Sequence, residues 1–275
     1  MKKKAIIISI KSFQLSKNEK FLLSNEKPWG LILFKRNIKS LKQLKKLTND
    51  IRKAVKDKYF PIMIDEEGGA VTRISRILNH NIHQKFFGDI YKINSKISIT
   101  IYKKYVLGIT SFLKKMGINV NTVPVLDVLR KSTNKIIGNR SFSEDKNTVK
   151  RLGEICVKQY ELNKIGTVIK HIPGHGCASA DSHKRMPKVN LSIQKLIDID
   201  FFPFKNNRSR FAMTAHILYK QLDQKNVATF SKKIIKNIIR GKLGFKGILI
   251  SDDISMKALK YDLLTNAKKS LSAGC

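Results

Sequence analysis

The sequence predicts an α/β protein built like a (β/α)8 barrel that lacks its eighth strand and final helix. Short β-branched apolar runs alternate with longer segments of helical period, as strands and helices do around a parallel sheet. Most of these runs end at or just before a polar or charged residue, and active sites form at the carboxyl ends of barrel strands. A doubly wound open sheet is the competing architecture, but no G-x-G-x-x-G phosphate loop follows the first run.

Seven apolar runs are expected to form the strands. They are Ala5–Ile10, Gly30–Phe34, Phe60–Asp65, Val120–Val125, Thr167–His171, Ala212–His216 and Gly247–Asp252. Each strand is followed by a segment of helical period. One helix begins at Ser16, with Glu19 in position to complete a capping box. The other helices are expected near Leu41–Val55, Ile97–Lys115, Lys146–Asn163, Ser192–Phe201, Ser231–Arg240 and Met256–Leu271.

No linker, repeat or low-complexity block divides the 275 residues, so residues 1–275 are expected to form a single barrel domain. No apolar run approaches the roughly twenty residues needed to cross a bilayer, and no membrane span is expected. The apolar run Ala5–Ile10 follows a basic start, as in a signal peptide. It is shorter than most such cores and lacks a small-x-small cleavage site, so it is interpreted as a buried strand.

Three cysteines, Cys156, Cys177 and Cys275, are too few and too scattered for a disulfide framework or a zinc site. This usage fits a reducing compartment, and a cytoplasmic location is expected. Cys177 lies in a histidine-rich loop, which leaves a reactive thiol open as an alternative, although nothing in the spacing singles it out.

The net charge of +35 normally suggests a nucleic-acid or anionic-membrane partner. Here the excess is mostly lysine, spread along the chain among many Ile and Asn residues, and a coding bias toward A/T-rich codons would produce the same mixture. No basic cluster is interleaved with aromatic residues, and no recognition-helix or zinc-finger pattern is present. No specific nucleic-acid partner is therefore expected, although the charge would attract anionic substrates at low salt.

The most concentrated chemistry lies in one glycine-bearing loop. It begins with Lys170-His171-Ile-Pro-Gly-His175-Gly and closes with Asp181-Ser-His183, so it holds three of the six histidines. Histidine changes its charge near neutral pH, and an aspartate two residues away can fix its tautomer and raise its basicity. The loop is expected to move protons or to bind a ligand.

Two further segments carry candidate ligands at strand ends. Asp65-Glu-Glu-Gly-Gly follows the third strand, and Arg73 lies four residues beyond it. Such carboxylates suit bidentate binding of sugar hydroxyls, while an acidic turn with an exposed arginine is about as good an interpretation of this motif alone. Arg140 lies in the long loop after the fourth strand and could bind a carboxylate or a sugar oxygen through its planar fork. Taken alone, Arg140 is better explained as a solvated surface arginine.

Ser251-Asp252-Asp253 ends the seventh strand. One of the two aspartates could simply cap the following helix. Asp252 belongs to the strand end and is expected to point into the barrel mouth. A carboxylate there, facing an acid/base group on a loop, is the arrangement of a retaining glycosidase, in which one group attacks the anomeric carbon and the other protonates the leaving oxygen.

These motifs resemble those of the β-N-acetylglucosaminidases of glycoside hydrolase family 3. The segments that carry the resemblance are Asp65-Glu-Glu-Gly-Gly, Lys170-His-Ile-Pro-Gly-His-Gly with Asp181-Ser-His, Ala212-Met-Thr-Ala-His and Ser251-Asp-Asp-Ile-Ser-Met. The resemblance implies a barrel enzyme that cleaves terminal N-acetylglucosamine from muropeptide fragments during peptidoglycan recycling. It implies retention of configuration, with neither a metal nor an organic cofactor.

The resemblance also implies roles for single residues. Asp252 would be the nucleophile that forms a covalent glycosyl-enzyme, and His183 would be the general acid/base, oriented by Asp181. The residues implied to bind the sugar are Asp65, Arg73, Arg140, Lys170 and His171.

The chain reaches Cys275 where the family continues into its eighth strand and helix, so the barrel is expected to be short at its C-terminal side. A truncated, inactive barrel or pseudoenzyme is therefore the alternative to an active hydrolase. A phosphorylase, in which phosphate replaces water, is a further alternative. The expected partner is a small saccharide or muropeptide, and the protein is expected to be a monomer.

Overall fold

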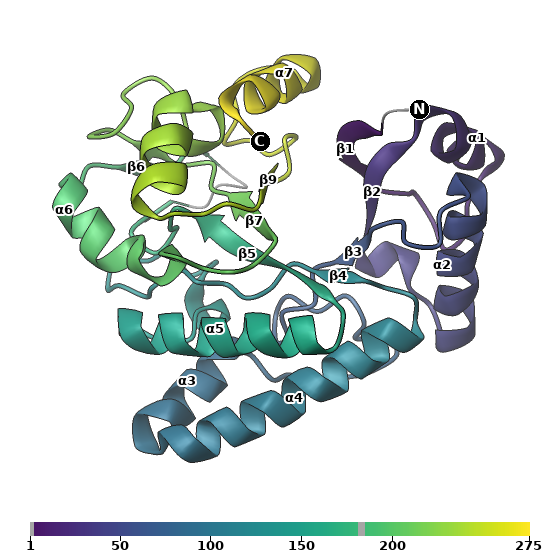
Figure 1. Cartoon of the computed structure of the whole chain (residues 1–275), viewed down its shortest axis with the longest axis horizontal. Helices are drawn as coiled ribbons and strands as arrows, with labels where there is room; N and C mark the ends of the chain where they lie inside the picture. The colour runs from purple at the N-terminus through teal and green to yellow at the C-terminus, as the bar shows by residue number, and fades with distance from the viewer. Residues whose placement is uncertain (1–2, 181–184) are drawn as a thin grey trace.

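The computed structural model describes residues 3–180 and 185–275, and its centre is a sheet of seven parallel strands. In spatial order the strands are β1 (Lys4–Ile8), β2 (Pro28–Leu33), β3 (Ile62–Ile64), β4 (Val120–Asn121), β5 (Gly166–Ile172), β7 (Phe211–Thr214) and β9 (Ile248–Ser251). The sheet curls into an open half-barrel whose two ends are β1 and β9 (Figure 1). The predicted seven-stranded, barrel-type α/β fold is confirmed, and each predicted run overlaps one of these strands.

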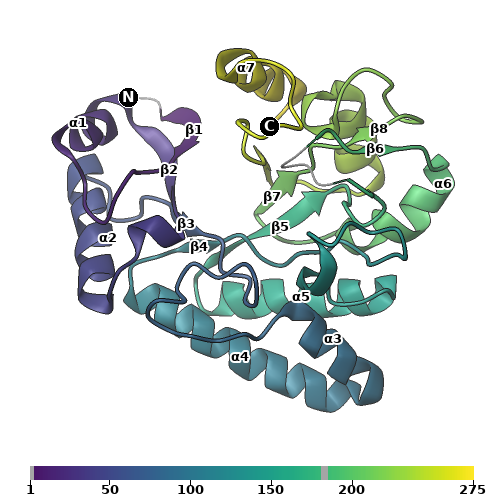
Figure 2. The same ribbon diagram turned by 180° about the vertical axis from the view of Figure 1, so that it is seen from behind.

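Helices line the outside of the curved sheet (Figures 1 and 2). The α-helices are α1 (Lys17–Glu26), α2 (Leu41–Val55), α3 (Gln84–Ile93), α4 (Ser95–Lys115), α5 (Lys146–Leu162), α6 (Ile193–Lys195) and α7 (Leu263–Ala273). Two segments wind as π-helices, η3 (Leu196–Asp200) and η6 (Ile234–Lys242). Short 3-10 turns are η1 (Lys35–Asn37), η2 (Gly138–Arg140), η4 (Phe202–Phe204) and η5 (Ala228–Phe230). No helix in the described ranges is both long and apolar enough to span a membrane.

The predicted capping box at the start of α1 is present. The Ser16 hydroxyl accepts the Glu19 amide N–H at 3.2 Å, and the Glu19 carboxylate accepts the Ser16 amide N–H at 2.8 Å. Two amide groups at the helix end are thereby satisfied reciprocally.

One predicted helix boundary is wrong, and one helix was not predicted. The last helix was expected from Met256, but α7 begins at Leu263, after Asp262 accepts the amide of Thr265. The chain turns before it because the Asp253 carboxylate binds both the amide and the hydroxyl of Ser255. Helix α3 was not predicted. It begins where the imidazole of His83 accepts the Phe86 amide N–H, an unusual cap.

The structure also differs from the prediction in the winding of two helices and in a second, small sheet. The predicted helices Ser192–Phe201 and Ser231–Arg240 are partly π-helical, with wider turns than an α-helix. A small parallel sheet, β6 (Lys188–Val189) with β8 (Leu218–Tyr219), lies outside the main sheet.

The packing of the concave face places the candidate site. A small apolar cluster of Met63, Val120, Val168 and Met213 comes from four adjacent strands. Side chains alternate between the two faces of a strand, so Val168 and Lys170 of β5 share one face. The apolar cluster therefore forms a floor, and polar residues at the strand ends lie above it.

Candidate active site

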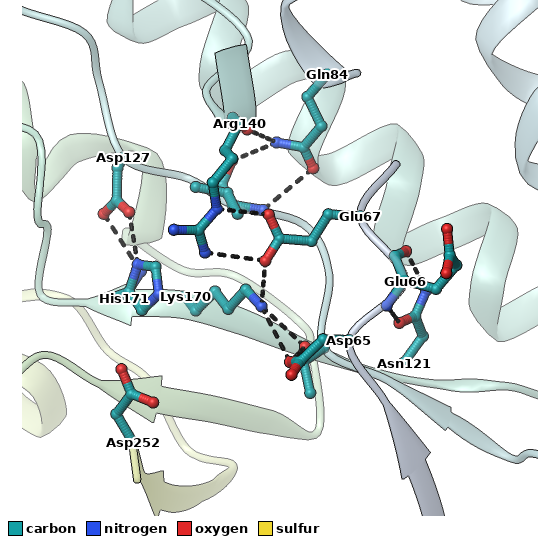
Figure 3. Close-up of polar contacts among 12 residues, drawn as sticks. Asp65, Glu66, Glu67, Gln84, Asn121, Asp127, Arg140, Lys170, His171 and Asp252 are labelled. Atoms are coloured by element: carbon teal, nitrogen blue, oxygen red, sulfur yellow. Dashed lines mark hydrogen bonds and ion pairs between the residues drawn. The ribbon is translucent and has the colours of Figure 1, made fainter. Parts of the chain in front are cut away.

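Polar side chains gather at the carboxyl ends of four strands (Figure 3). They are Asp65 after β3, Asp127 in the loop after β4, Lys170 and His171 in β5, and Asp252 after β9. Parallel strands of one sheet bring their carboxyl ends to the same edge, and the site therefore combines residues that are far apart in sequence.

The Asp65 carboxylate is held by two cations and a hydroxyl group. Arg73 Nη2 donates to Asp65 Oδ2 at 3.0 Å, and Lys170 Nζ lies 3.4 Å from Oδ1. The Thr122 hydroxyl also donates to Oδ1. Burial would raise the pKa of Asp65, but Lys170 and Arg73 hold it well below its usual range. Asp65 is therefore a fixed anion at neutral pH.

Glu67 forms a second, more deeply buried ion cluster. Its carboxylate accepts two hydrogen bonds from the Arg140 guanidinium, at 2.7 and 2.9 Å, and one contact of 2.5 Å from Lys170 Nζ. Burial would raise the pKa of Glu67, but Arg140 and Lys170 lower it to about 2. Gln84 fixes the same loop by donating to the Arg140 carbonyl oxygen at 2.5 Å. Lys170 thus bridges the two carboxylates.

Asp127 is completely buried and binds the segment that carries the histidines. Its Oδ2 lies 2.7 Å from His171 Nδ1. Its Oδ1 accepts the amide N–H groups of His171 at 3.2 Å and His175 at 2.6 Å. Burial would raise the pKa of Asp127, but His171 lowers it below its usual value. The pair of Asp127 and His171 is a carboxylate–imidazole unit at the end of β5.

Asp252 lies across the site from these clusters, on the last strand (Figure 3). It is half-buried, and within the described residues its carboxylate makes one hydrogen bond, from the Asp253 amide at 2.8 Å. Burial would raise the pKa of Asp252, but His216 and His171 lower it below its usual value. The group is an anion whose second oxygen has no partner among the described residues.

The first part of the histidine loop, residues 174–180, is anchored to neighbouring segments. The Tyr219 hydroxyl donates to the Gly174 carbonyl oxygen, and the Thr133 hydroxyl donates to that of Gly176, both at 2.5 Å. The predicted acid/base pair of Asp181 and His183 lies at positions 181–184, outside the residues that the structure describes. Their roles stay predictions.

Two partners of the predicted ligands were missed by sequence reasoning. Glu67, which binds Arg140 and Lys170, stood in the acidic turn after β3, but nothing singled it out from its neighbours. Asp127 lies just after a predicted strand. That position marks it as a candidate site residue, although it does not predict the pairing with His171.

The arrangement combines a fixed set of polar groups with one available carboxylate. The ion clusters present donors and acceptors suited to hydroxyl groups, while Asp252 can attack an electrophilic carbon. Across residues 3–180 and 185–275, no three His, Cys, Asp or Glu side chains are grouped so as to hold a metal ion.

The chain is similar to known proteins of a single family. The chain matches the glycosyl hydrolase family 3 N-terminal domain over residues 2–275. It is 34% identical to a β-hexosaminidase of Neisseria meningitidis serogroup A, over 98% of this chain and 76% of that protein.

Solved structures agree with this match. Native NagZ from Neisseria gonorrhoeae superposes with a TM-score of 0.91 at 31% identity, covering 99% of this chain and 80% of NagZ. The same protein in complex with N-trifluoroacetyl-D-glucosamine gives a TM-score of 0.89 at 30% identity, again over 99% and 80% of the two chains. The chain therefore belongs to glycosyl hydrolase family 3, and it is a glycoside hydrolase of the β-hexosaminidase, NagZ-like β-N-acetylglucosaminidase group.

Proposed function

We propose that this protein is a retaining exo-β-N-acetylglucosaminidase that releases terminal N-acetylglucosamine from muropeptide fragments of peptidoglycan. The observation that carries the proposal is the position of Asp252. It is an anion with one oxygen unpartnered among the described residues, and it faces a cluster of fixed charges across the site. A nucleophile needs this freedom, because an oxygen engaged in an ion pair attacks poorly.

The reaction proceeds in two displacements. In the first, Asp252 attacks the anomeric carbon while the bond to the leaving oxygen breaks, and His183 gives that oxygen a proton. In the second, water attacks the anomeric carbon of the glycosyl-enzyme. His183 takes a proton from this water, and the bond to Asp252 breaks. Asp181 orients His183 through both steps. Two inversions at one carbon give net retention.

The sugar is held by Asp65, Arg73, Arg140, Lys170 and His171. Ion pairs with one another or with Glu67 fix the first four of these residues before substrate arrives, so little conformational entropy is lost on binding. The complex of gonococcal NagZ with N-trifluoroacetyl-D-glucosamine supports a sugar of this type as the ligand.

The aglycone is a muropeptide, and the role is peptidoglycan recycling in the cytoplasm, as the family resemblance implies. The net charge of +35 fits this substrate class, because a muropeptide bears carboxylates that a positive field attracts at low salt. The enzyme acts as a monomer and uses its own side chains, with no metal or organic cofactor.

Turnover of a chromogenic N-acetyl-β-glucosaminide tests the proposal. The wild-type protein is expected to release the chromophore, and the first N-acetylglucosamine seen by NMR is expected to be the β-anomer. Asp252→Asn should abolish release, while the matched variant Asp253→Asn should keep it, because within the described part of the chain the Asp253 side chain hydrogen-bonds to Ser255 alone. Well-folded wild-type protein without turnover, or Asp252→Asn with full turnover, would contradict the proposal.

A further inference from the structure

Asp127 connects three parts of the candidate site without lining it. It is 0% exposed, whereas the His171 imidazole that it binds reaches the site. Its side chain holds His171 and His175, and its main-chain oxygen accepts the Ser141 hydroxyl at 2.5 Å, next to Arg140. A fully buried carboxylate cannot contact the substrate, so Asp127 can affect the reaction only by positioning the residues that it binds.

The two carboxylate oxygens of Asp127 have separate tasks. Oδ1 accepts the backbone N–H groups of His171 and His175, whereas Oδ2 contacts, among the residues that the structure describes, only His171 Nδ1. A carboxylate can only accept, so Nδ1 must carry the proton in this contact. In the neutral imidazole the other nitrogen, Nε2, is then an acceptor. The contact at Oδ2 therefore makes Nε2 of the neutral His171 imidazole an acceptor, and not a donor, toward a sugar hydroxyl.

The contact at Oδ1 fixes the root of the histidine loop. The His175 amide N–H lies 2.6 Å from Oδ1, four residues after His171 and beside the anchored carbonyl groups of Gly174 and Gly176. Because Asp127 is buried and ionised, this charge-assisted hydrogen bond is among the stronger ones available to a backbone amide.

We propose that Asp127 is a positioning residue that sets the working tautomer of His171 through Oδ2 and anchors the start of the 174–180 loop through Oδ1. The proposal rests on the proposed glycosidase function for the role of His171 as a sugar ligand. The assignment of the tautomer itself depends only on the geometry of the two side chains.

The two tasks can be separated by substitution. Asp127→Asn keeps an oxygen that can stay at the Oδ1 position and accept both amides, but it places an NH2 group opposite His171 Nδ1. Nδ1 must then accept, which moves the imidazole proton to Nε2. Asp127→Ala removes both contacts. Asp145→Asn is the matched control, because Asp145 also accepts two backbone amides, at the start of α5, and lies outside the site.

The experiment combines kinetics with 15N NMR of histidine-labelled protein, with the His171 signals assigned from His171→Gln. Wild-type His171 should show a protonated Nδ1. Asp127→Asn should invert the tautomer and lower kcat/KM on the chromogenic substrate by about 100-fold or more, with Tm close to that of Asp145→Asn. Asp127→Ala should lower kcat/KM further.

An unchanged His171 tautomer in Asp127→Asn, or an unchanged kcat/KM despite inversion, would overturn the proposal. Wild-type protein without turnover would instead count against the proposed function alone, since the His171 signals would still decide whether Asp127 sets the tautomer.

Discussion

The two sides of the candidate site are built differently. On the side of β3 to β5, buried charges pair with one another, as Lys170 does with Asp65 and Glu67. On the side of β9, at the end of the sheet, Asp252 is half-buried and has one hydrogen bond within the described residues. The first side is held by linked ion pairs, and removing one of its charges takes a counter-charge away from a buried partner. The second side holds a carboxylate whose second oxygen has no partner among the described residues.

Under the proposed function, the paired side binds the sugar and the β9 side forms the covalent bond to it. An enzyme gains rate from groups whose interactions strengthen in the transition state, and it gains orientation from groups that are fixed beforehand. Substitutions on the two sides should therefore have different consequences: loss of fold and binding on one, loss of chemistry alone on the other.

The largest effect is expected at Asp252. Asp252→Asn should lower kcat by at least about 1,000-fold, because the amide cannot form the covalent intermediate. Its free energy of unfolding should stay within about 1 kcal/mol of wild type, since a half-buried residue with one hydrogen bond contributes little. Turnover assays and urea titrations measure the two quantities. If Asp252→Asn unfolded readily, the proposed difference between the two sides would be contradicted.

Glu67→Gln should have the next largest effect, and mainly on stability. The neutral amide leaves Arg140 buried without a counter-charge and leaves Lys170 with Asp65 alone, which should lower the free energy of unfolding by about 3–5 kcal/mol. Glu26→Gln is the matched control, because the Glu26–Lys4 pair is exposed and should contribute less than about 1 kcal/mol. Equal losses in urea titrations would contradict the stabilising role of the linked ion pairs on the paired side.

Acid should destabilise the protein in two stages. Burial and the nearby His171 lower the pKa of His175 to about 4, from an ordinary value of 6.5. The unfolded chain therefore binds a proton more readily than the folded one between these values, and stability should fall as the pH drops from about 6.5 to about 4.

Glu67 governs the second stage. Arg140 and Lys170 overcome the effect of burial and lower its pKa from 4.5 to about 2, so its stabilisation is complete above about pH 4.5 and is lost as the pH falls toward about 2. Thermal unfolding measured across this range should show that His175→Gln flattens the upper stage alone. A His175→Gln profile identical to that of wild type would contradict the neutral, buried state of His175.

The smallest effect is expected at the rim of the paired side. Arg73→Lys keeps the charge but loses the planar guanidinium that reaches Asp65 at 3.0 Å from a partly exposed position. KM should rise by roughly 10-fold with kcat nearly unchanged, corresponding to about 1 kcal/mol of lost binding. A fall in kcat equal to that of Asp252→Asn would place Arg73 in the chemistry and not in binding.

The sequence predicted the seven strands because each is an apolar run that ends in a polar residue, and the position of Asp252 follows from that rule. It could not predict the pairing of Glu67 with Arg140, 73 residues away, or of Asp127 with His171, 44 residues away, because only the closed sheet brings them together. The late start of α7 could not be predicted for a local reason. An aspartate at position 253 favours a helix cap by its residue type, but in the structure Asp253 binds Ser255 and the chain turns there.

Trapping of the glycosyl-enzyme tests the central claim most directly. An N-acetylglucosaminide with an activated leaving group, which speeds formation of the glycosyl-enzyme relative to its hydrolysis, is mixed with the protein, and the mixture is quenched in acid and digested for mass spectrometry. We predict one N-acetylglucosaminyl group on the peptide that contains Asp252, absent from Asp252→Asn and present in Asp253→Asn. A label on a different residue, or efficient turnover that gives the inverted α-anomer with no covalent species, would contradict the account.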